Sequence, residues 1–390
     1  MLSATIDNVP YYGFKSYNVS RSVEDVAGEF SLTLTCEGFD GLPFKKGSKI
    51  IIYANTTAIL TGYIEALSVG YSDNDHTITI TGRDKCADII DSTIGSQIEL
   101  NAPITLDKVI QTVLKQINAS DVKVLTNFSG IKPFLQGELV SGEITETIFE
   151  FLEKYTRKRQ VLMNTDGRGN IVLTRAGSTR AENSLVHVVE GDTSKNNILS
   201  GAATFDDRDR FHIYEIVSQG NVSAFNATNS RFSAEDIVNR KAIAIDSDIR
   251  PSRVLHLTAE SASDIATLKE RVNWECNIRR ARSIGYSCTV QGHLMSENGK
   301  PWAPNLLVRV TDHYALIDAD LLIKSVTYDY DTSGGSITHI ECVPKDSYLP
   351  EPEPSKKEKQ TNKVGRSKKK KRKRKPDISY PPPVRYEGDE

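Results

Sequence analysis

The stretch from Ser283 to Pro344 restricts the fold of this chain more than any other segment. Apolar and polar residues alternate through it in runs separated by turn signals, as in Leu306–Val310 and Leu322–Tyr328, and a period of two residues is typical of strands. Gly334 and Gly335 lie between two such runs and can adopt the positive φ that a tight hairpin needs. We therefore predict four strands in this stretch.

Two features flank these strands. Trp302 lies between two prolines, so its segment is extended, and we expect the ring to close the end of a barrel. Before the strands, apolar residues recur at helical spacing from Ser263, a candidate N-cap, to Ser283. The last turn of this helix holds three basic residues that complement the helix dipole. Nucleic-acid contact is the alternative role for these three residues, which are Arg279, Arg280 and Arg282.

Residues 1 to about 95 predict another β domain. Phe30, Leu32 and Leu34 alternate with hydroxyl side chains, which is the pattern of a half-buried strand. Further short runs bounded by turn residues favour a small antiparallel barrel or sandwich. The polar residues Arg83, Asp84 and Asp88 follow the last run; they are candidates for a catalytic group, and a polar link at a strand end is the more ordinary interpretation.

From about 96 to 180 the pattern becomes mixed α and β. Thr105 can cap one helix, and Glu143 to Lys158 predicts a second. The segment Asp166–Gly169 contains two glycines, as a phosphate loop does, but it lacks the strand-to-helix context and the Lys-Ser/Thr pair, so we predict a hairpin.

Residues 181 to about 260 are less regular. Phe211, Ile213 and Glu215 alternate with His212, Tyr214 and Ile216 in one predicted strand. The preceding cluster from Asp206 to Arg210 contains carboxylates that could act as acid and base. The interleaved arginines would lower the pKa of both carboxylates, so an ion-pair cluster is the favoured interpretation.

The charge of the chain is unevenly distributed. From Lys356 to Glu390, fourteen basic residues accompany five acidic ones, a net charge of +9, and since the whole chain carries −2, residues 1 to 355 carry −11. This basic tail has no apolar pattern that could be buried, so we predict that it is disordered on its own. Its charge density calls for an anionic partner, namely DNA, an acidic protein face or a membrane surface, with a solvated spacer as the alternative. The candidate binding residues form one uninterrupted block: Lys368, Lys369, Lys370, Lys371, Arg372, Lys373, Arg374 and Lys375.

Other signals argue against several classes of protein. The chain has no run of about 18 uncharged apolar residues, so no membrane span is predicted, and its N-terminus does not resemble a secretion signal. Five scattered cysteines without C-x-x-C spacing indicate buried thiols rather than disulfides or metal ligands. Metal-ligand, nucleotide-binding and hydrolase motifs are absent, so we expect no enzyme activity, no cofactor and no metal.

Several ordered motifs resemble one known family. The segments LTGYIEAL and ITITGRDKCADIIDST near the N-terminus, VNWECN with the following arginines, and the run from Gly299 and Trp302 through LLIKSVTYDYD to ECVP are similar to the baseplate hub proteins of Mu-like contractile-tail phages. Related hub domains occur in late-control D-type phage proteins and in type VI secretion spikes. The resemblance covers most of residues 1 to 348, and the basic tail departs from it.

This resemblance implies a fold that is mainly β, with two tube-like antiparallel β-barrel domains on either side of a mixed α/β region and a disordered tail. We expect a first barrel at 1–95, an α/β domain at 96–180, a return segment at 181–225 that packs with the first domain, and a second barrel at 226–348 with its leading helix at 263–283. The tail covers 349–390.

The implied function is structural. Three copies would form a pseudo-six-fold ring that joins the hexameric tail tube to the trimeric spike, in the virion and, during assembly, in the host cytoplasm. The expected partners are the chain itself, the spike, the tube or tube-initiator protein and other baseplate proteins; the tail could reach the tape-measure protein or the end of the DNA. Two alternatives remain open, a baseplate-associated cell-wall hydrolase and a nucleic-acid-binding protein.

Overall fold

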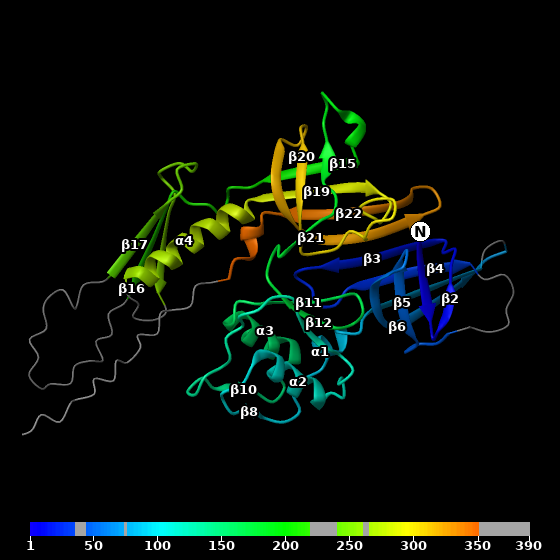
Figure 1. The fold of residues 1–390 in the computed structure, drawn as a ribbon, viewed down its shortest axis with the longest axis horizontal. Coiled ribbons are helices and arrows are strands. Elements are labelled where there is room, and N and C mark those ends of the chain that lie inside the picture. Colours follow the sequence, from blue (N-terminus) through cyan, green and yellow to red (C-terminus); the bar gives the residue numbers. More distant parts are fainter. Residues whose placement is uncertain (36–43, 74–75, 219–239, 260–264, 351–390) are drawn as a thin grey trace, which may run out of the picture. The chain divides into compact units, whose positions relative to one another are not determined.

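The computed structural model describes residues 1–35, 44–73, 76–218, 240–259 and 265–350. Its largest feature is one sheet of fourteen strands (Figure 1). These strands are β1 (Leu2–Ile6), β2 (Val9–Tyr11), β3 (Ser16–Ser22), β4 (Glu29–Thr35), β5 (Lys49–Ala54), β6 (Thr57–Tyr71), β7 (His76–Asp84), β13 (Thr179–Arg180), β14 (Leu185–His187), β15 (Ile198–Phe205), β19 (Ile284–Gln291), β20 (Leu306–Asp312), β21 (Ile317–Asp331) and β22 (Gly335–Val343).

The sheet joins the two ends of the chain. Its main path runs β15-β19-β22-β21-β3-β4-β7-β6-β5-β1-β2, so the antiparallel pair of β3 and β21 connects the N-terminal strands to the C-terminal ones. Side chains from both groups form one apolar core that includes Leu32, Ile50, Trp302 and Tyr328. The predicted β-rich fold with an α/β insertion is confirmed, and so is the hairpin at Gly334 and Gly335, which joins β21 to β22.

A second core belongs to the inserted α/β region. Its buried residues, such as Val109 and Phe151, form a cluster separate from that of the large sheet. The elements are α1 (Ala87–Asp91), β8 (Ile98–Leu100), α2 (Leu106–Gln116), β9 (Val124–Thr126), β10 (Val140–Gly142), α3 (Ile148–Lys158), β11 (Leu162–Thr165) and β12 (Ile171–Thr174).

The starts of the two long helices of this region differ from expectation in detail. Thr105 occupies the N-cap of α2, but its side chain makes no capping hydrogen bond. The second helix begins at Ile148, not at Glu143, because Thr147 and Glu150 form a reciprocal capping box. That T-x-x-E pattern is visible in the sequence and marks the helix start.

The hairpin predicted at Asp166–Gly169 joins antiparallel β11 and β12. Gly167 has a φ of +76°, and its carbonyl accepts a hydrogen bond of 2.9 Å from the hydroxyl of Thr61 on β6. An added Cβ at Gly167 would lie 2.7 Å from the carbonyl oxygen of Ile59, so only glycine allows this close approach. The α/β region is thereby attached to the first group of strands.

A third core lies beside the long helix. The strands β16 (Ile213–Ser218), β17 (Arg240–Ile245) and β18 (Val254–Ala259) form their own three-stranded sheet, which packs against α4 (Ile265–Arg282). The expected helix is present, while its candidate cap Ser263 lies outside the described residues. Two short 3-10 helices, Thr193–Lys195 and Lys345–Tyr348, complete the elements named here.

Two expected domain assignments differ from the observed pairing. The expected second barrel includes the residues of β17 and β18, but these strands pair with β16, because their apolar faces cover α4. The return segment 181–225 is expected to pack with the first domain. Its strands β14 and β15 pair with β20 and β19, while Leu185 and Ile198 lie in the core that the two groups of strands share. Alternation identified these strands, but a strand pattern does not identify its partner.

Candidate assembly interface

The large sheet contains the same five-strand unit twice. In the first unit the order is β3-β4-β7-β6-β5, and in the second it is β15-β19-β22-β21-β20. Each unit starts with two paired strands, β3 with β4 or β15 with β19. A three-strand meander follows, β5-β6-β7 or β20-β21-β22, and its last strand pairs with β4 or β19. The strands β6 and β21 both have 15 residues, and β7 and β22 both have 9. The order alone identifies a duplication that spans both ends of the chain.

The two units also share a β-bulge. The register of β6 against β7 shifts between Ile64 and Ala66, and that of β21 against β22 shifts between Ile323 and Ser325. The preceding backbone contacts correspond as well, since the carbonyl of Ile64 accepts from Gly47 N at 2.7 Å, and that of Ile323 accepts from Asn305 N at 2.9 Å. A β-bulge occurs at a defined position of a fold. Superimposing the two bulges therefore matches each residue of one unit with a residue of the other.

Inside one chain the two units meet where β3 pairs with the second half of β21. Tyr17 of β3 stacks on Tyr330 at a ring separation of 5.2 Å, and Val19 and Tyr328 are opposite each other and fully buried. We call the pairing of β3 with the second half of β21 the internal junction.

A buried polar network stabilises the internal junction. The hydroxyl of Tyr17 lies 2.7 Å from Nε2 of His293 and accepts a hydrogen bond from Leu2 N, while Nδ1 of His293 lies 2.9 Å from the hydroxyl of Thr338. Burial, together with the charge of the chain's amino terminus, lowers the pKa of His293 to about 4. Both ring nitrogens therefore have partners while the ring is neutral, which is a structural arrangement.

The duplication predicts a second junction of the same kind, but within the described part of the chain the two strand edges that would form it are unpaired. There β15, the counterpart of β3, pairs only with β19, and residues 66–71 of β6, the counterpart of 325–330 in β21, pair only with β7. Large apolar side chains are exposed along these two strand edges: Val69 at 51 %, Tyr71 at 84 %, Leu199 at 57 % and Phe205 at 59 %. Unpaired apolar edges of this kind are sites of strand addition.

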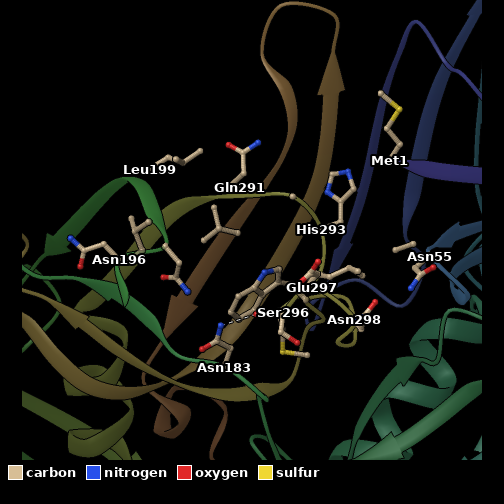
Figure 2. A pocket seen from close by; sticks show the side chains of 18 residues that line it. Met1, Asn55, Asn183, Asn196, Leu199, Gln291, His293, Ser296, Glu297 and Asn298 are labelled. Carbon is tan, nitrogen blue, oxygen red and sulfur yellow. Dashed lines mark hydrogen bonds between the residues drawn. The ribbon is translucent and has the colours of Figure 1, made fainter. Parts of the chain in front are cut away.

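A pocket of about 800 Å³ lies at one end of the sheet (Figure 2). Figure 2 shows Asn183 and Asn196 on one side and Met1 and Asn55 on the other, with the buried Trp302 contributing to the wall. Amide side chains do not gain or lose a proton near neutral pH and are not nucleophiles. His293, Ser296 and Glu297 also line the pocket, and both ring nitrogens of His293 are already hydrogen-bonded in the internal junction. The lining therefore resembles a polar seam between strands more than a catalytic centre.

The charged residues considered as catalytic candidates have different environments. Arg83 binds Glu65 at 2.8 Å and Asp91 at 2.5 Å, Asp84 is buried and accepts from Cys86 N, and Asp88 is exposed. Burial raises the pKa of Asp84 to about 6. These groups do not converge on one cavity.

The cluster from Asp206 to Arg210 also forms ion pairs. Arg208 pairs with Asp206, while Arg210 reaches the fully buried Asp246 at 2.8 Å, which in turn accepts from Arg280 at 2.7 Å. Burial opposes the charge of Asp246, but the hydrogen bonds from the two arginines outweigh it and hold the pKa of that carboxyl below its usual value. Arg279 pairs with Glu275. These interactions favour a structural role for the helix-terminal arginines over nucleic-acid contact.

Four cysteines (Cys86, Cys276, Cys288 and Cys342) are free and buried, and Cys36 lies outside the described residues. Within the described ranges, no three His, Cys, Asp or Glu side chains are grouped as a metal site would require, and no helix has the length and apolar character needed to cross a membrane. The candidate anion-binding block Lys368–Lys375 lies outside the described residues.

The family resemblance implies two similar β domains, but the residue pattern by itself reveals neither the duplication nor its free edges. A weak signal is present, since the run Ile64 to Ser68 (IEALS) and the run Ile323 to Thr327 (IKSVT) share an apolar, charged, small, apolar, hydroxyl order. Five residues do not distinguish a repeat from chance. The shared bulge within both runs identifies the correspondence.

Comparisons with known proteins agree along the chain. Three family models match: "Mu phage baseplate assembly protein GpP-like, N-terminal" over residues 2–84, "Baseplate hub protein gp44-like, second domain" over 86–175, and "Mu phage baseplate assembly protein GpP, fourth domain" over 264–351. The baseplate hub protein gp44 of Escherichia phage Mu is 29 % identical over 344 residues, which cover 87 % of this chain and 86 % of gp44.

Solved structures give the same result. The 43 kDa tail protein of prophage MuSo2 from Shewanella oneidensis is 27 % identical with a TM-score of 0.70, covering 89 % of this chain and 99 % of that one. A tail protein from Neisseria meningitidis MC58 is 16 % identical, also with a TM-score of 0.70, covering 90 % and 98 %, and supports the fold.

Proposed function

The chain belongs to the Mu-like family of phage baseplate hub proteins, and from that premise we propose that three copies form a ring of six equivalent β units that joins a six-fold tail tube to a three-fold central spike. The observation that supports this proposal is the duplicated five-strand unit with its shared bulge. A chain with two equivalent units, assembled three times, presents six similar surfaces to one neighbour and remains three-fold for the other.

The test is the mass of the purified full chain in solution, measured by light scattering coupled to size exclusion. We expect three times the 43.2 kDa of one chain, either for the protein alone or in a complex with its spike. A chain that stays monomeric at every concentration, with and without the spike, would contradict the proposal.

The partners follow from this position in the tail. We propose that one face of the ring binds the tube or a tube-initiator protein, that the other binds the spike, and that further baseplate proteins surround it. The ring would assemble in the host cytoplasm and remain in the virion. No chemistry is required for these roles, and the relatives that match are structural hub components. Release of soluble fragments from peptidoglycan by the purified protein would argue for the hydrolase alternative.

The basic tail needs a separate proposal, because the family models end at residue 351. We propose that Lys368–Lys375 bind an anionic partner inside the phage tail tube, either an acidic surface of the tape-measure protein or the end of the DNA. The block carries eight consecutive positive charges while residues 1 to 355 carry −11, so repulsion disfavours contact between the body and an anionic partner.

A further inference from the structure

We infer that β15 of one copy pairs with residues 66–72 of a second copy, antiparallel and in the register in which β3 pairs with β21 inside one chain. This inference rests on the proposed ring and adds the strands and the register that build its subunit interface. It follows from the residue-by-residue correspondence of the two units.

The correspondence fixes the register through three pairings. Matching the bulges makes Val69 the counterpart of Tyr328 and Gly82 that of Cys342. The pairs of β7 with β4 and of β22 with β19 then make Phe30 the counterpart of Tyr286. Their partners in turn match Val19 with Ala203.

The internal junction pairs Tyr328 with Val19. Its counterpart between two copies therefore pairs Val69 with Ala203. The neighbouring pairs on the same face are Leu67 with Phe205 and Tyr71 with Gly201. On the opposite face the register pairs Ser68 with Thr204 and Gly70 with Ala202.

Exposure differs between the two junctions as this pairing requires. Tyr328 is fully buried where β3 covers it, while its counterpart Val69 is 51 % exposed. On the other strand Val19 is fully buried, while the counterpart β15 is exposed along most of its length. The same positions of the same fold are thus covered in one unit and uncovered in the other. A strand from a second copy would remove the difference.

The side chains at the uncovered edges fit each other. Phe205 is 59 % exposed and would lie opposite the aliphatic Leu67, an apolar cross-strand pair. Tyr71 would lie opposite Gly201, the counterpart of Tyr17, just as Tyr330 lies opposite Tyr17 in the internal junction. Leu67 and Ala203 already border the common core, so this face continues the core across the boundary.

A second copy of the chain is the occupant because each copy supplies both edges. The contact is head-to-tail, so each copy gives β15 to one neighbour and receives a β15 from the other. Three such contacts close a ring in which every one of these edges is paired. A strand from a different protein would satisfy only one of the two edges.

A disulfide between the two strands tests the register. In the internal junction, Val23 N donates to Lys324 O at 2.8 Å, so these two residues are a hydrogen-bonded pair. Hydrogen-bonded and non-hydrogen-bonded pairs alternate along antiparallel strands. Thr327 and Ser20, three positions further along, are therefore a non-hydrogen-bonded pair. The counterpart pair is Ser68 and Thr204, with an expected Cα separation of about 4.5 Å, which suits a disulfide. In the full chain carrying Ser68→Cys and Thr204→Cys, mild oxidation should produce a covalent trimer on a non-reducing gel.

The matched control shifts the register by two residues. Ser68→Cys with Ala202→Cys places the thiols on a diagonal of about 7–8 Å, too long for a direct disulfide, and should yield at least several-fold less trimer. Each single variant controls for the natural cysteines. If the protein is trimeric by mass but the matched pair gives no more cross-linking than the shifted pair, the strand register is wrong while the proposed ring stands. A monomer overturns both.

A proline variant provides an independent measurement. In the derived register the N–H of Val69 points to the free edge, where proline is tolerated within a single chain. Val69→Pro should leave the monomer folded by circular dichroism but weaken self-association by on the order of tenfold per contact, through one lost hydrogen bond. Val69→Thr keeps the N–H and should associate as the natural chain does. Equal association of the two variants would contradict the inferred pairing.

Discussion

The histidine at the internal junction makes the stability of the protein depend on pH. The pKa of His293 is about 4 when folded, against an ordinary value near 6.5. As the pH falls through this window, the unfolded chain binds a proton that the folded chain does not, so stability decreases. Between pH 7 and pH 4 the loss from this residue is on the order of 3 kcal/mol.

The measurement compares urea unfolding of the natural chain and of His293→Gln at the two pH values. Asp84 acts in the opposite direction, because its raised pKa of about 6 makes the folded state bind the extra proton as the pH falls, and subtraction of the variant removes that common contribution. The variant should lose less stability on acidification. An unchanged difference between the two proteins at pH 7 and pH 4 would exclude this role for His293.

Asp246 is the second residue with a large expected effect. Its carboxylate is fully buried and binds both Arg210 and Arg280. Asp246→Asn leaves two guanidinium groups without their common counter-charge and should destabilise the chain by about 3 kcal/mol in denaturant unfolding. The control is Asp248→Asn, because Asp248 is 66 % exposed and its loss should cost no more than about 0.5 kcal/mol. Similar losses for both variants would show that the buried network is not the cause.

At the scale of elements, the hairpin between β11 and β12 is the attachment of the α/β region to the first β unit. Gly167→Ala must tolerate both a positive φ and a Cβ 2.7 Å from the Ile59 carbonyl oxygen, so we expect a loss of about 2–4 kcal/mol. Gly137→Ala is the control, because Gly137 has a φ of +95° and open space around it, which isolates the backbone cost of about 1–2 kcal/mol. Thermal unfolding of both variants measures the two losses of stability. Equal losses would show that the added Cβ at position 167 has no steric conflict with β6.

Local signals predicted the elements better than their pairing. The hairpin at Gly334–Gly335, the leading helix up to Arg282 and the turn at Asp166–Gly169 follow from residues that are neighbours in sequence. The pairing of β3 with β21 joins residues about three hundred positions apart, and period-two alternation is the same whichever partner a strand finds. For the same reason the edges of β15 and β6 could not be recognised before their neighbours were known.

At the scale of the whole molecule, the basic tail should dominate binding to polyanions. We expect the full chain to bind double-stranded DNA with an affinity that falls steeply with salt, with a log–log slope of up to about −7 for eight contacts. A chain that ends at Leu349 should lose this binding, and so should a full chain in which the eight residues are replaced by glutamine. Fluorescence anisotropy across a salt series measures all three. Binding retained by the shortened chain would support the nucleic-acid-binding alternative, in which the body makes the contact.

The internal junction also bears on how the protein is made. A ribosome releases Ser16–Ser22 near the start of synthesis, but the strand that covers them, Ile317–Asp331, emerges only near the end. One edge of β3 therefore stays unpaired during most of synthesis. Closing a loop this long is slow, because the chain loses conformational entropy before the contact between the strands forms. A nascent chain that stalls before codon 317 would leave the edge of β3 uncovered, so we expect interrupted translation to favour aggregation of this chain.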